Sequence, residues 1–414
     1  MTQPGRGISA EEAATRLGVK PATLYAYVSR GVLRRHRAPG GRSRFDPVEI
    51  DQLARRGRPR RPRGASELVI ESAVTALGDD RPYYRGRDAL ELATRWQLEQ
   101  VAGWLWTGEA GPAPPAVWRS LPAAVAAGRA AQASLPADVL PLERLQVITP
   151  ALAATDSLRH TFEPSAVVAI GQHLIAGLVD CLPGSTPDPA AGSIAHRLAG
   201  KLAATPVETG LPVEPGLPVQ PGLVDVLRAA LVVLADHELA ASTLAVRVAA
   251  SVRADPYAAV MVGLGAMGGA LHGGASLAAE AMVAQAQDPD HGRQLIGQRL
   301  RRGERVPGLG HVVYRHEDGR GRLLLDLLRA AAPGHARLAV VDAMLDEVAQ
   351  RRLPALNVDF GLAALTQVAG MVPGAGEAIF AVARTVGWLA HALEEYARPT
   401  RLRPRATYLG PPAE

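Results

Sequence analysis

The order of apolar and polar residues along the 414-residue chain predicts two parts of different architecture. In the first part, apolar positions at helical spacing predict a short helix from Ser9, a turn at residues 17–19 and a second helix from Pro21 to Arg30. Gly31 would end the second helix. One small core would take in six side chains, which are Ala13, Ala14, Leu17, Leu24, Tyr27 and Val28.

Two short basic strands around a tight turn at residues 39–41 come next, and a third helix would begin at Pro47. This pattern resembles the winged helix-turn-helix domain of the MerR and excisionase type, whose second helix enters the major groove of DNA. The resemblance implies that residues 1–54 bind DNA through five arginines, which are Arg30, Arg34, Arg35, Arg42 and Arg44. A basic arm that docks on protein is the alternative interpretation.

The distribution of charge supports a polyanion as partner for this end of the chain only. Residues 1–65 hold fifteen Arg and Lys against five Asp and Glu, a net charge of +10, whereas the whole chain carries +5. The remainder is therefore acidic overall. Residues 55–65, rich in Pro and Arg, would link the first domain to the rest of the chain.

From residue 66 onward the apolar pattern is helical almost throughout and shows no sustained alternation of period two. It predicts an all-α body of enzyme size. The repeat GLPVEPGLPVQPGLV at residues 210–224 is short and proline-rich, and it predicts an extended surface loop. A single cysteine, Cys181, and an N-terminus without an apolar signal core favour a reducing cytoplasm.

Three long apolar runs each carry one ionisable residue, which are His272, Asp359 and Arg384. Burial of an unpaired charge costs several kcal/mol, so these residues either pair with one another or serve a ligand. Taken singly, each has a structural explanation, and Asp359 could cap a helix starting at Phe360. The run at residues 256–279 is long enough to span a membrane, but its six glycines favour a buried segment.

The glycines around His272 would allow a sharp turn between two buried helices and the close approach of a ligand. The imidazole would then lie at a helix start among backbone amides, and its pKa would be lowered. A neutral ring could donate a hydrogen bond to a developing oxyanion. Asp359 in an apolar setting would have a raised pKa and would serve as a base near neutrality.

Six motifs of the chain, in the same order, resemble those of one known family. GALHGGAS (residues 269–276) is similar to the family's GPLHGGAN, LADHELAAS (234–242) to HADHExNAS, and VPGLGHVVYRHEDGR (306–320) to PGFGHRVYKxxDPR. NVDF and AIFAVARTVGWLAH resemble the segments that carry the catalytic aspartate and an arginine. YYRGRDALELATRWQLEQVAGWLWTGE resembles the family's opening segment, so the resemblance covers roughly residues 66–412. The family that these motifs resemble is citrate synthase.

The resemblance implies a citrate-synthase-like fold with large and small helical domains, preceded by the small winged helix-turn-helix domain. The large domain would comprise residues 66–273 and 370–414, and the small domain residues 274–369. The implied activity is that of an acyltransferase that converts the acyl group into an alkyl group on transfer. Acetyl-CoA would condense with oxaloacetate and water to give citrate and CoA, with no metal or redox cofactor.

The family's catalytic residues correspond to Asp359 as the base at the thioester methyl, His272 as donor to the thioester oxygen and His311 at the ketone of oxaloacetate. The implied oxaloacetate ligands are His237, Arg320 and Arg384, with Arg403 supplied by the other subunit of a homodimer. Ser242 would hold His272. The implied CoA-binding residues are Val306, Leu309 and Gly310.

Several residues depart from the family pattern, which are Leu234, Ala240, Ser276, Gly319 and residues 361–363. None of them has an assigned part in bond making, but they leave the shape of the substrate pocket open. Propionyl-CoA as acyl donor would make the chain a 2-methylcitrate synthase. A DNA-binding regulator with a metabolite-sensing synthase body is the alternative from another class.

Overall fold

The computed structural model describes residues 7–17, 19, 24, 27–28, 33–37, 43–47, 49–50, 70–109, 117–185, 192–204, 220–404, 406, 408 and 410. It contains two compact units, one of residues 1–70 with 403–414 and one of residues 71–402. The predicted DNA-contact residues Arg30 and Arg42 lie outside the described residues, as does most of the predicted second helix.

The first unit combines one described helix with a small antiparallel sheet. β1 (Ile8–Ser9), α1 (Ala10–Leu17), β2 (His36–Arg37) and β3 (Ser43–Phe45) are its described elements. The sheet order is β1-β3-β2, with His36 opposite Arg44, as expected for a wing. Ala13, Ala14 and Leu24 are buried with Leu33, Phe45 and Ile50, and the remaining predicted core residues pack against them.

The second unit opens with a three-stranded antiparallel sheet and is otherwise helical. Its strands are β4 (Thr75–Leu77), β5 (Pro82–Tyr84) and β6 (Arg87–Asp88). The helices in chain order are α4 (Ala89–Arg95), α5 (Leu98–Thr107), α6 (Pro122–Ala131), α7 (Pro141–Thr155), α8 (Pro164–Cys181), α9 (Ile194–Leu202), α11 (Pro221–Leu234), α12 (Ala241–Ser251), α13 (Pro256–Met267), α14 (Gly273–Gln285), α15 (Pro289–Arg301), α16 (Gly319–Ala331), α17 (Ala336–Gln350), α18 (Val358–Val368) and α19 (Ala375–Ala397). The all-α prediction is confirmed for this body, apart from the sheet, whose strands are too short to show a period.

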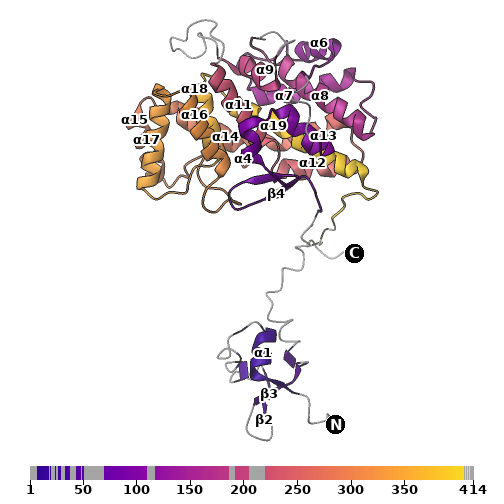
Figure 1. Cartoon of the computed structure of the whole chain (residues 1–414), viewed down its shortest axis with the longest axis vertical. Coiled ribbons are helices and arrows are strands. Elements are labelled where there is room, and N and C mark those ends of the chain that lie inside the picture. The colour runs from indigo at the N-terminus through magenta and orange to yellow at the C-terminus, as the bar shows by residue number, and fades with distance from the viewer. Residues whose placement is uncertain are drawn as a thin grey trace. The chain divides into compact units, whose positions relative to one another are not determined.

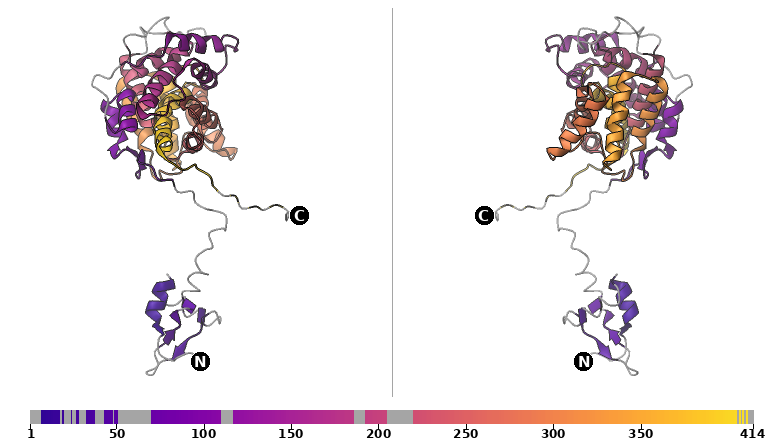
Figure 2. Two further views of the ribbon diagram at one scale, coloured as in Figure 1. Left: turned by 90° about the vertical axis from the view of Figure 1, so that its right-hand side faces the viewer. Right: turned by 90° about the vertical axis from the view of Figure 1, so that its left-hand side faces the viewer.

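Helix α19 runs through the middle of the unit, and helices from most of the chain surround it (Figure 1). Twenty of its 23 residues are buried, because apolar side chains occupy every face. Helices α14 to α18 form a group to one side, in which α18 packs on α14 and α16 (Figure 1). The right-hand view of Figure 2 brings the orange helices of this group to the front.

Two sequence expectations need correction in this unit. Most of the loop predicted at residues 210–224 lies outside the described residues, and its last residues are helical instead, because α11 begins at Pro221, where proline suits the first helical turn. Asp359 does not cap a helix at Phe360, because the Asn357 side chain accepts hydrogen bonds from the N–H groups of both residues and caps α18. Among the described helices, α8 alone is long and apolar enough to cross a membrane, and 61% of it is buried in the protein.

Candidate active site

His272 is the residue immediately before helix α14. The chain turns there so tightly that a Cβ on Gly273 would lie 2.6 Å from the carbonyl oxygen of Met267. Only glycine fits this close approach of two backbones. The helix start thus holds a half-buried imidazole whose side chain makes no capping bond. Burial, and secondly the charge of Arg384, lowers the pKa of His272 to about 4.

The hydrogen bonds of Ser242 allow His272 to carry its proton on Nδ1. Ser242 Oγ lies 2.7 Å from His272 Nε2, and Trp388 Nε1 donates to the same Oγ at 3.2 Å. An indole N–H can only donate, so the serine hydroxyl proton is free to go to His272 Nε2. The neutral ring then carries its proton on Nδ1, and no described residue accepts from that N–H.

His311 is fixed by its own backbone turn. Its Nδ1 accepts hydrogen bonds from the N–H groups of Val313 and Tyr314, at 3.1 and 3.2 Å. The proton of the neutral ring is therefore on Nε2. Burial, and secondly the charge of Arg320, lowers the pKa of His311. His311 Nε2 lies 3.4 Å from a terminal nitrogen of Arg320, so two N–H donors lie side by side without an acceptor between them.

His237 lies against His311, with ring centroids 5.3 Å apart. Its Nε2 makes a 2.9 Å hydrogen bond with the Tyr314 hydroxyl. Burial holds the pKa of His237 well below the usual value, and the charges of Arg320 and Arg384 lower it further. The neutral His237, the neutral His311 and two guanidinium groups therefore form a positive, donor-rich group suited to a dicarboxylate.

The two buried arginines of this group differ in their partners. Arg320 is bound by Asp318 through two hydrogen bonds of 2.9 and 2.8 Å, and Asp318 also accepts from the N–H of Val358. Arg384 is 1% exposed and donates from Nε to the carbonyl of Leu234 at 2.9 Å. One of its terminal nitrogens, Nη2, is buried without a hydrogen-bond partner. Burial lowers the pKa of Arg384 to about 10.

Asp359 lies in the first turn of α18, half-buried. No described residue donates a hydrogen bond to its carboxylate. Burial raises its pKa from the 3.8 of a free side chain to about 6, while the charge of Arg320 opposes the shift. The charge of Arg320 therefore acts on Asp359, and Arg320 in turn lies 3.4 Å from His311 Nε2.

The predicted CoA-binding segment is held beside the start of α18. Leu309 pairs with Leu356 as an isolated β-bridge, and the N–H of Gly310 donates to the carbonyl of Ala355. The Asn357 side chain donates to the carbonyl of Gly310 at 2.9 Å. Gly310 has a φ of +73°, which favours glycine. Val306 is buried at the other end of the segment.

Arg403 is exposed and belongs to the other compact unit, with residues 1–70. Sequence reasoning also missed residues that the structure brings into the site, which are Tyr84, Asp236, Tyr314, Asp318, Phe380 and His391. The signal for Asp318 was available, since an Asp two residues before Arg320 at a helix start is a capping pattern. Tyr84 comes from a distant segment, and the other four lie near predicted residues in the sequence without a local pattern that marks their contacts.

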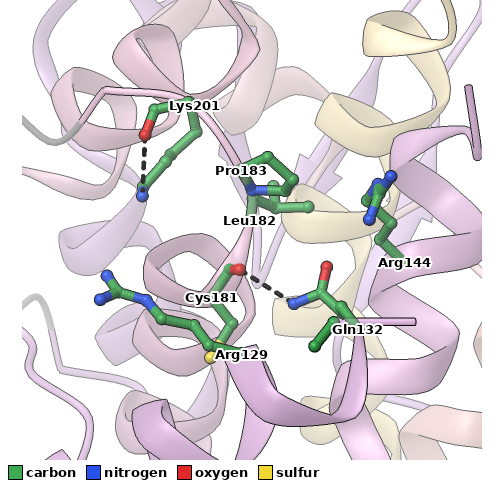
Figure 3. A pocket seen from close by; sticks show the side chains of 9 residues that line it. Arg129, Gln132, Arg144, Cys181, Leu182, Pro183 and Lys201 are labelled. Atoms are coloured by element: carbon green, nitrogen blue, oxygen red, sulfur yellow. Dashed lines mark hydrogen bonds between the residues drawn. The ribbon is translucent and has the colours of Figure 1, made fainter. Parts of the chain in front are cut away.

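A pocket of about 420 Å³ lies elsewhere, between α6, α7, α9 and the end of α8 (Figure 3). Its three cations already bind backbone carbonyls: Arg129 that of Asp180, Arg144 those near Pro136, and Lys201 that of Gly184. Burial raises the pKa of Cys181 to about 11, so the thiol is uncharged at neutral pH. No predicted site residue lines this pocket, and it is not the candidate site.

The helical fold and the group of neutral histidines, arginines and one raised-pKa carboxylate define a protein suited to proton transfer on a bound dicarboxylate. The family model of the citrate synthase C-terminal domain matches residues 65–405, and the chain belongs to the citrate synthase family. A helix-turn-helix domain model matches residues 8–58.

Curated relatives carry two different names. Citrate synthase 2 of Bacillus subtilis is 34% identical over 192 residues, which is 45% of this chain and 51% of that protein. This match spans only about half the length of that relative. A 2-methylcitrate synthase of Mycobacterium tuberculosis is 27% identical over 385 residues, 85% of this chain and 91% of that protein.

Solved structures of the family share the fold. Citrate synthase from Thermotoga maritima is 23% identical with a TM-score of 0.66, over 85% of this chain and 96% of that one. Citrate synthase from Thermoplasma acidophilum, in a complex with carboxymethyl coenzyme A and oxaloacetate, gives 22% and 0.67, over 84% and 96%.

Proposed function

We propose that the chain is a citrate synthase that condenses acetyl-CoA with oxaloacetate and water to give citrate and CoA. The observation that carries the proposal is the set of free proton-transfer groups. Asp359 has a raised pKa and an unoccupied carboxylate, while His272 and His311 each keep one N–H directed away from the partner that fixes the ring. A protein that only senses a dicarboxylate would need the arginines but not this set.

In the proposed reaction Asp359, His272 and His311 each have one role. Asp359 takes a proton from the methyl carbon of acetyl-CoA while the Nδ1–H of His272 stabilises the thioester oxygen as the enol forms. The methyl carbon then attacks the ketone of oxaloacetate, and the Nε2–H of His311 supplies a hydrogen bond or proton to the ketone oxygen. Attack of water on citryl-CoA breaks the thioester bond and releases citrate and CoA.

Arg320, Arg384 and His237 would bind the two carboxylates of oxaloacetate. Arg384 supports this assignment best, because its Nη2 is buried without a partner and a carboxylate oxygen would satisfy it. Oxaloacetate would also supply the acceptor that the adjacent donors of His311 and Arg320 lack. Acetyl-CoA enters as co-substrate along residues 306–310.

The acyl donor is the part of this proposal that needs measurement, since relatives are named for both products. Steady-state release of CoA should be compared for acetyl-CoA and propionyl-CoA, with oxaloacetate saturating. We expect the higher kcat/KM with acetyl-CoA. Preference for propionyl-CoA would identify a 2-methylcitrate synthase, whereas thermal stabilisation by oxaloacetate without any CoA release would identify a sensor.

We also propose a homodimer, formed through exposed apolar residues of α12, its C-terminal cap and α13. Val248, Val252, Met261 and Val262 are 41–59% exposed, although the two helices are otherwise well packed. Arg403 would reach the partner's site from this dimer. Mixing unfolded Asp359→Asn and Arg403→Ala chains and refolding them should restore activity, because each heterodimer then keeps one complete site. No recovery above either parent would contradict the shared site.

For residues 1–54 we propose DNA binding. Arg34 and Arg35 are exposed just before β2, while the Arg44 guanidinium on β3 binds the carbonyl of Gly7. Binding of a labelled duplex should weaken steeply with salt, because cationic contacts to phosphates release counterions. Equal affinity of a chain lacking residues 1–64 would contradict the proposal. We also propose a cytoplasmic location, because the single cysteine of the chain, Cys181, is a buried free thiol.

A further inference from the structure

A network of buried ionisable side chains begins at Asp236, the residue next to His237. Asp236, Arg247, His391 and Glu395 are each at most 1% exposed and come from the turn after α11, from α12 and from α19. Burying four such groups is costly unless every charge is paired. No role in bond making accounts for them, because none is among the groups assigned to the reaction.

In this network the hydrogen bonds from Arg247 through His391 are donated toward Asp236. Arg247 donates from Nη1 to His391 Nδ1 at 2.6 Å, and His391 Nε2 lies 3.3 Å from Asp236 Oδ2. Since arginine can only donate, His391 Nδ1 is the acceptor and the proton of the neutral ring is on Nε2. The His391–Asp236 contact is therefore a hydrogen bond from a fixed tautomer to a carboxylate. Arg247 is held in turn by the carboxylates of Glu394 and Glu395.

Asp236 connects this network to His237, the proposed oxaloacetate ligand. Its Oδ2 also accepts from the N–H of Glu238 at 3.1 Å, so the carboxylate closes a turn around His237. Glu238 has a φ of +53°, a strained conformation that this bond helps to hold. Burial opposes ionisation of Asp236, but His391 and Arg384 outweigh it and keep its pKa below the usual value.

Helix α19 holds the same turn at two more points. The N–H of Gly387 donates to the carbonyl of Ala235 at 3.0 Å, and Arg384 Nε donates to that of Leu234. Arg384 lies one helical turn before Gly387, and Gly387 lies one helical turn before His391. The three residues therefore share the face of α19 that is directed at the loop around His237. The positions of His237 and Arg384 are therefore set together by one helix and one turn.

We propose that His391 and Arg247 are positioning residues that fix Asp236 and thereby set the affinity of the site for oxaloacetate. The proposal rests on the proposed function, since it takes His237 and Arg384 as the oxaloacetate ligands. Neither His391 nor Arg247 touches substrate. Their loss should move oxaloacetate binding and leave the binding of the acyl-CoA unchanged, because the CoA segment at residues 306–310 packs against residues 355–357 instead.

The test compares three variants of the full chain. His391→Asn leaves an amide too short to reach Asp236, whereas the longer amide of His391→Gln can still donate to it. Thr385→Val is the matched control, because Thr385 is fully buried on the same helix and its hydroxyl bonds only to the carbonyl of Ala381. For each, the Kd for oxaloacetate is measured by calorimetry, and KM for both substrates and kcat are measured by CoA release.

We expect His391→Asn to raise the Kd and KM for oxaloacetate about 10- to 100-fold, as for a lost hydrogen bond to a charged group. KM for acetyl-CoA should stay within about twofold of wild type, His391→Gln should recover most of the affinity, and Thr385→Val should resemble wild type. Equal effects of Asn and Gln, or parallel losses for both substrates, would overturn the positioning role.

Failure of the proposed function has a different signature. A wild-type chain that binds oxaloacetate without releasing CoA would refute the catalytic activity, while the calorimetric Kd values would still decide the role of His391. Absence of any oxaloacetate binding by the wild type would refute both.

Discussion

Replacement of Asp359 by asparagine is expected to abolish turnover and to stabilise the fold at neutral pH. The carboxylate is half-buried at the start of α18, has no hydrogen-bond donor among the described residues, and has a pKa raised by burial to about 6. A carboxyl group whose folded pKa exceeds its unfolded pKa binds its proton more tightly in the folded state. Its ionisation therefore costs stability as the pH rises from 3.8 to about 6.

The size of the effect follows from that interval. At about 1.4 kcal/mol per pH unit, the cost above pH 6 is about 3 kcal/mol. The asparagine amide also lacks partners, which cancels about 1 to 2 kcal/mol of the gain. We therefore expect Asp359→Asn to raise the free energy of unfolding by about 1 to 2 kcal/mol at about pH 7.5, and to lower it by about 1 kcal/mol near pH 4, where the penalty of the unpaired amide remains but little of the ionisation cost does.

Urea unfolding followed by tryptophan fluorescence at the two pH values measures this difference. Asp318→Asn is the matched control with the opposite sign, because Arg320 outweighs burial and keeps the pKa of Asp318 below its usual value. The ionised Asp318 carboxylate therefore stabilises the fold at pH values above its unfolded pKa. This stabilisation is lost as the pH falls through the pKa of Asp318 in the folded state. An Asp359→Asn protein that is less stable than wild type near pH 7.5, or that retains turnover, would refute the reasoning.

Three further outcomes follow from the same geometry. Arg384→Leu should weaken oxaloacetate binding at least about tenfold yet leave the urea midpoint unchanged or higher, since it removes a buried guanidinium that lacks an ion pair; a collapse of stability would indicate a structural role. Gly387→Ala should destabilise the fold by about 2 kcal/mol or more and raise the KM for oxaloacetate, since its Cβ would collide with Asp236 and the carbonyl of Ala235; a neutral effect in both assays would argue against a tight turn. The rate kcat/KM for acetyl-CoA should fall about tenfold per pH unit below about pH 6, as Asp359 takes up its proton, with no limb from His272 until about pH 4; a constant rate down to pH 5 would contradict the assigned base.

Short-range features of the site could be predicted from sequence, because glycine spacing, lone charges in apolar runs and helix-start patterns are local. The half-buried His272 and Asp359 and the buried Arg384 follow from such signals. The partners of these groups could not, since Asp236 and His391 are 155 residues apart and only the packing of α19 on the turn joins them. The sequence left open whether the lone charges pair with one another or serve a ligand, and the buried, unpartnered nitrogen of Arg384 favours the ligand.

Elements too short or too irregular to show a period were also out of reach. The strands β4 to β6 have two or three residues each, fewer than an alternating pattern needs. The start of α11 was hidden by a repeat whose last proline serves as a helix start. Asn and Asp are both common N-cap residues, so the sequence alone does not show whether Asn357 or Asp359 caps α18.

The most direct test of the account is the release of free CoA from acetyl-CoA by the purified wild-type chain, with and without oxaloacetate, beside Asp359→Asn. We predict release that requires oxaloacetate, yields citrate in equal amount and disappears in the variant. No oxaloacetate-dependent release by the wild type, or release by Asp359→Asn at a comparable rate, would contradict the proposal that these residues carry out the condensation.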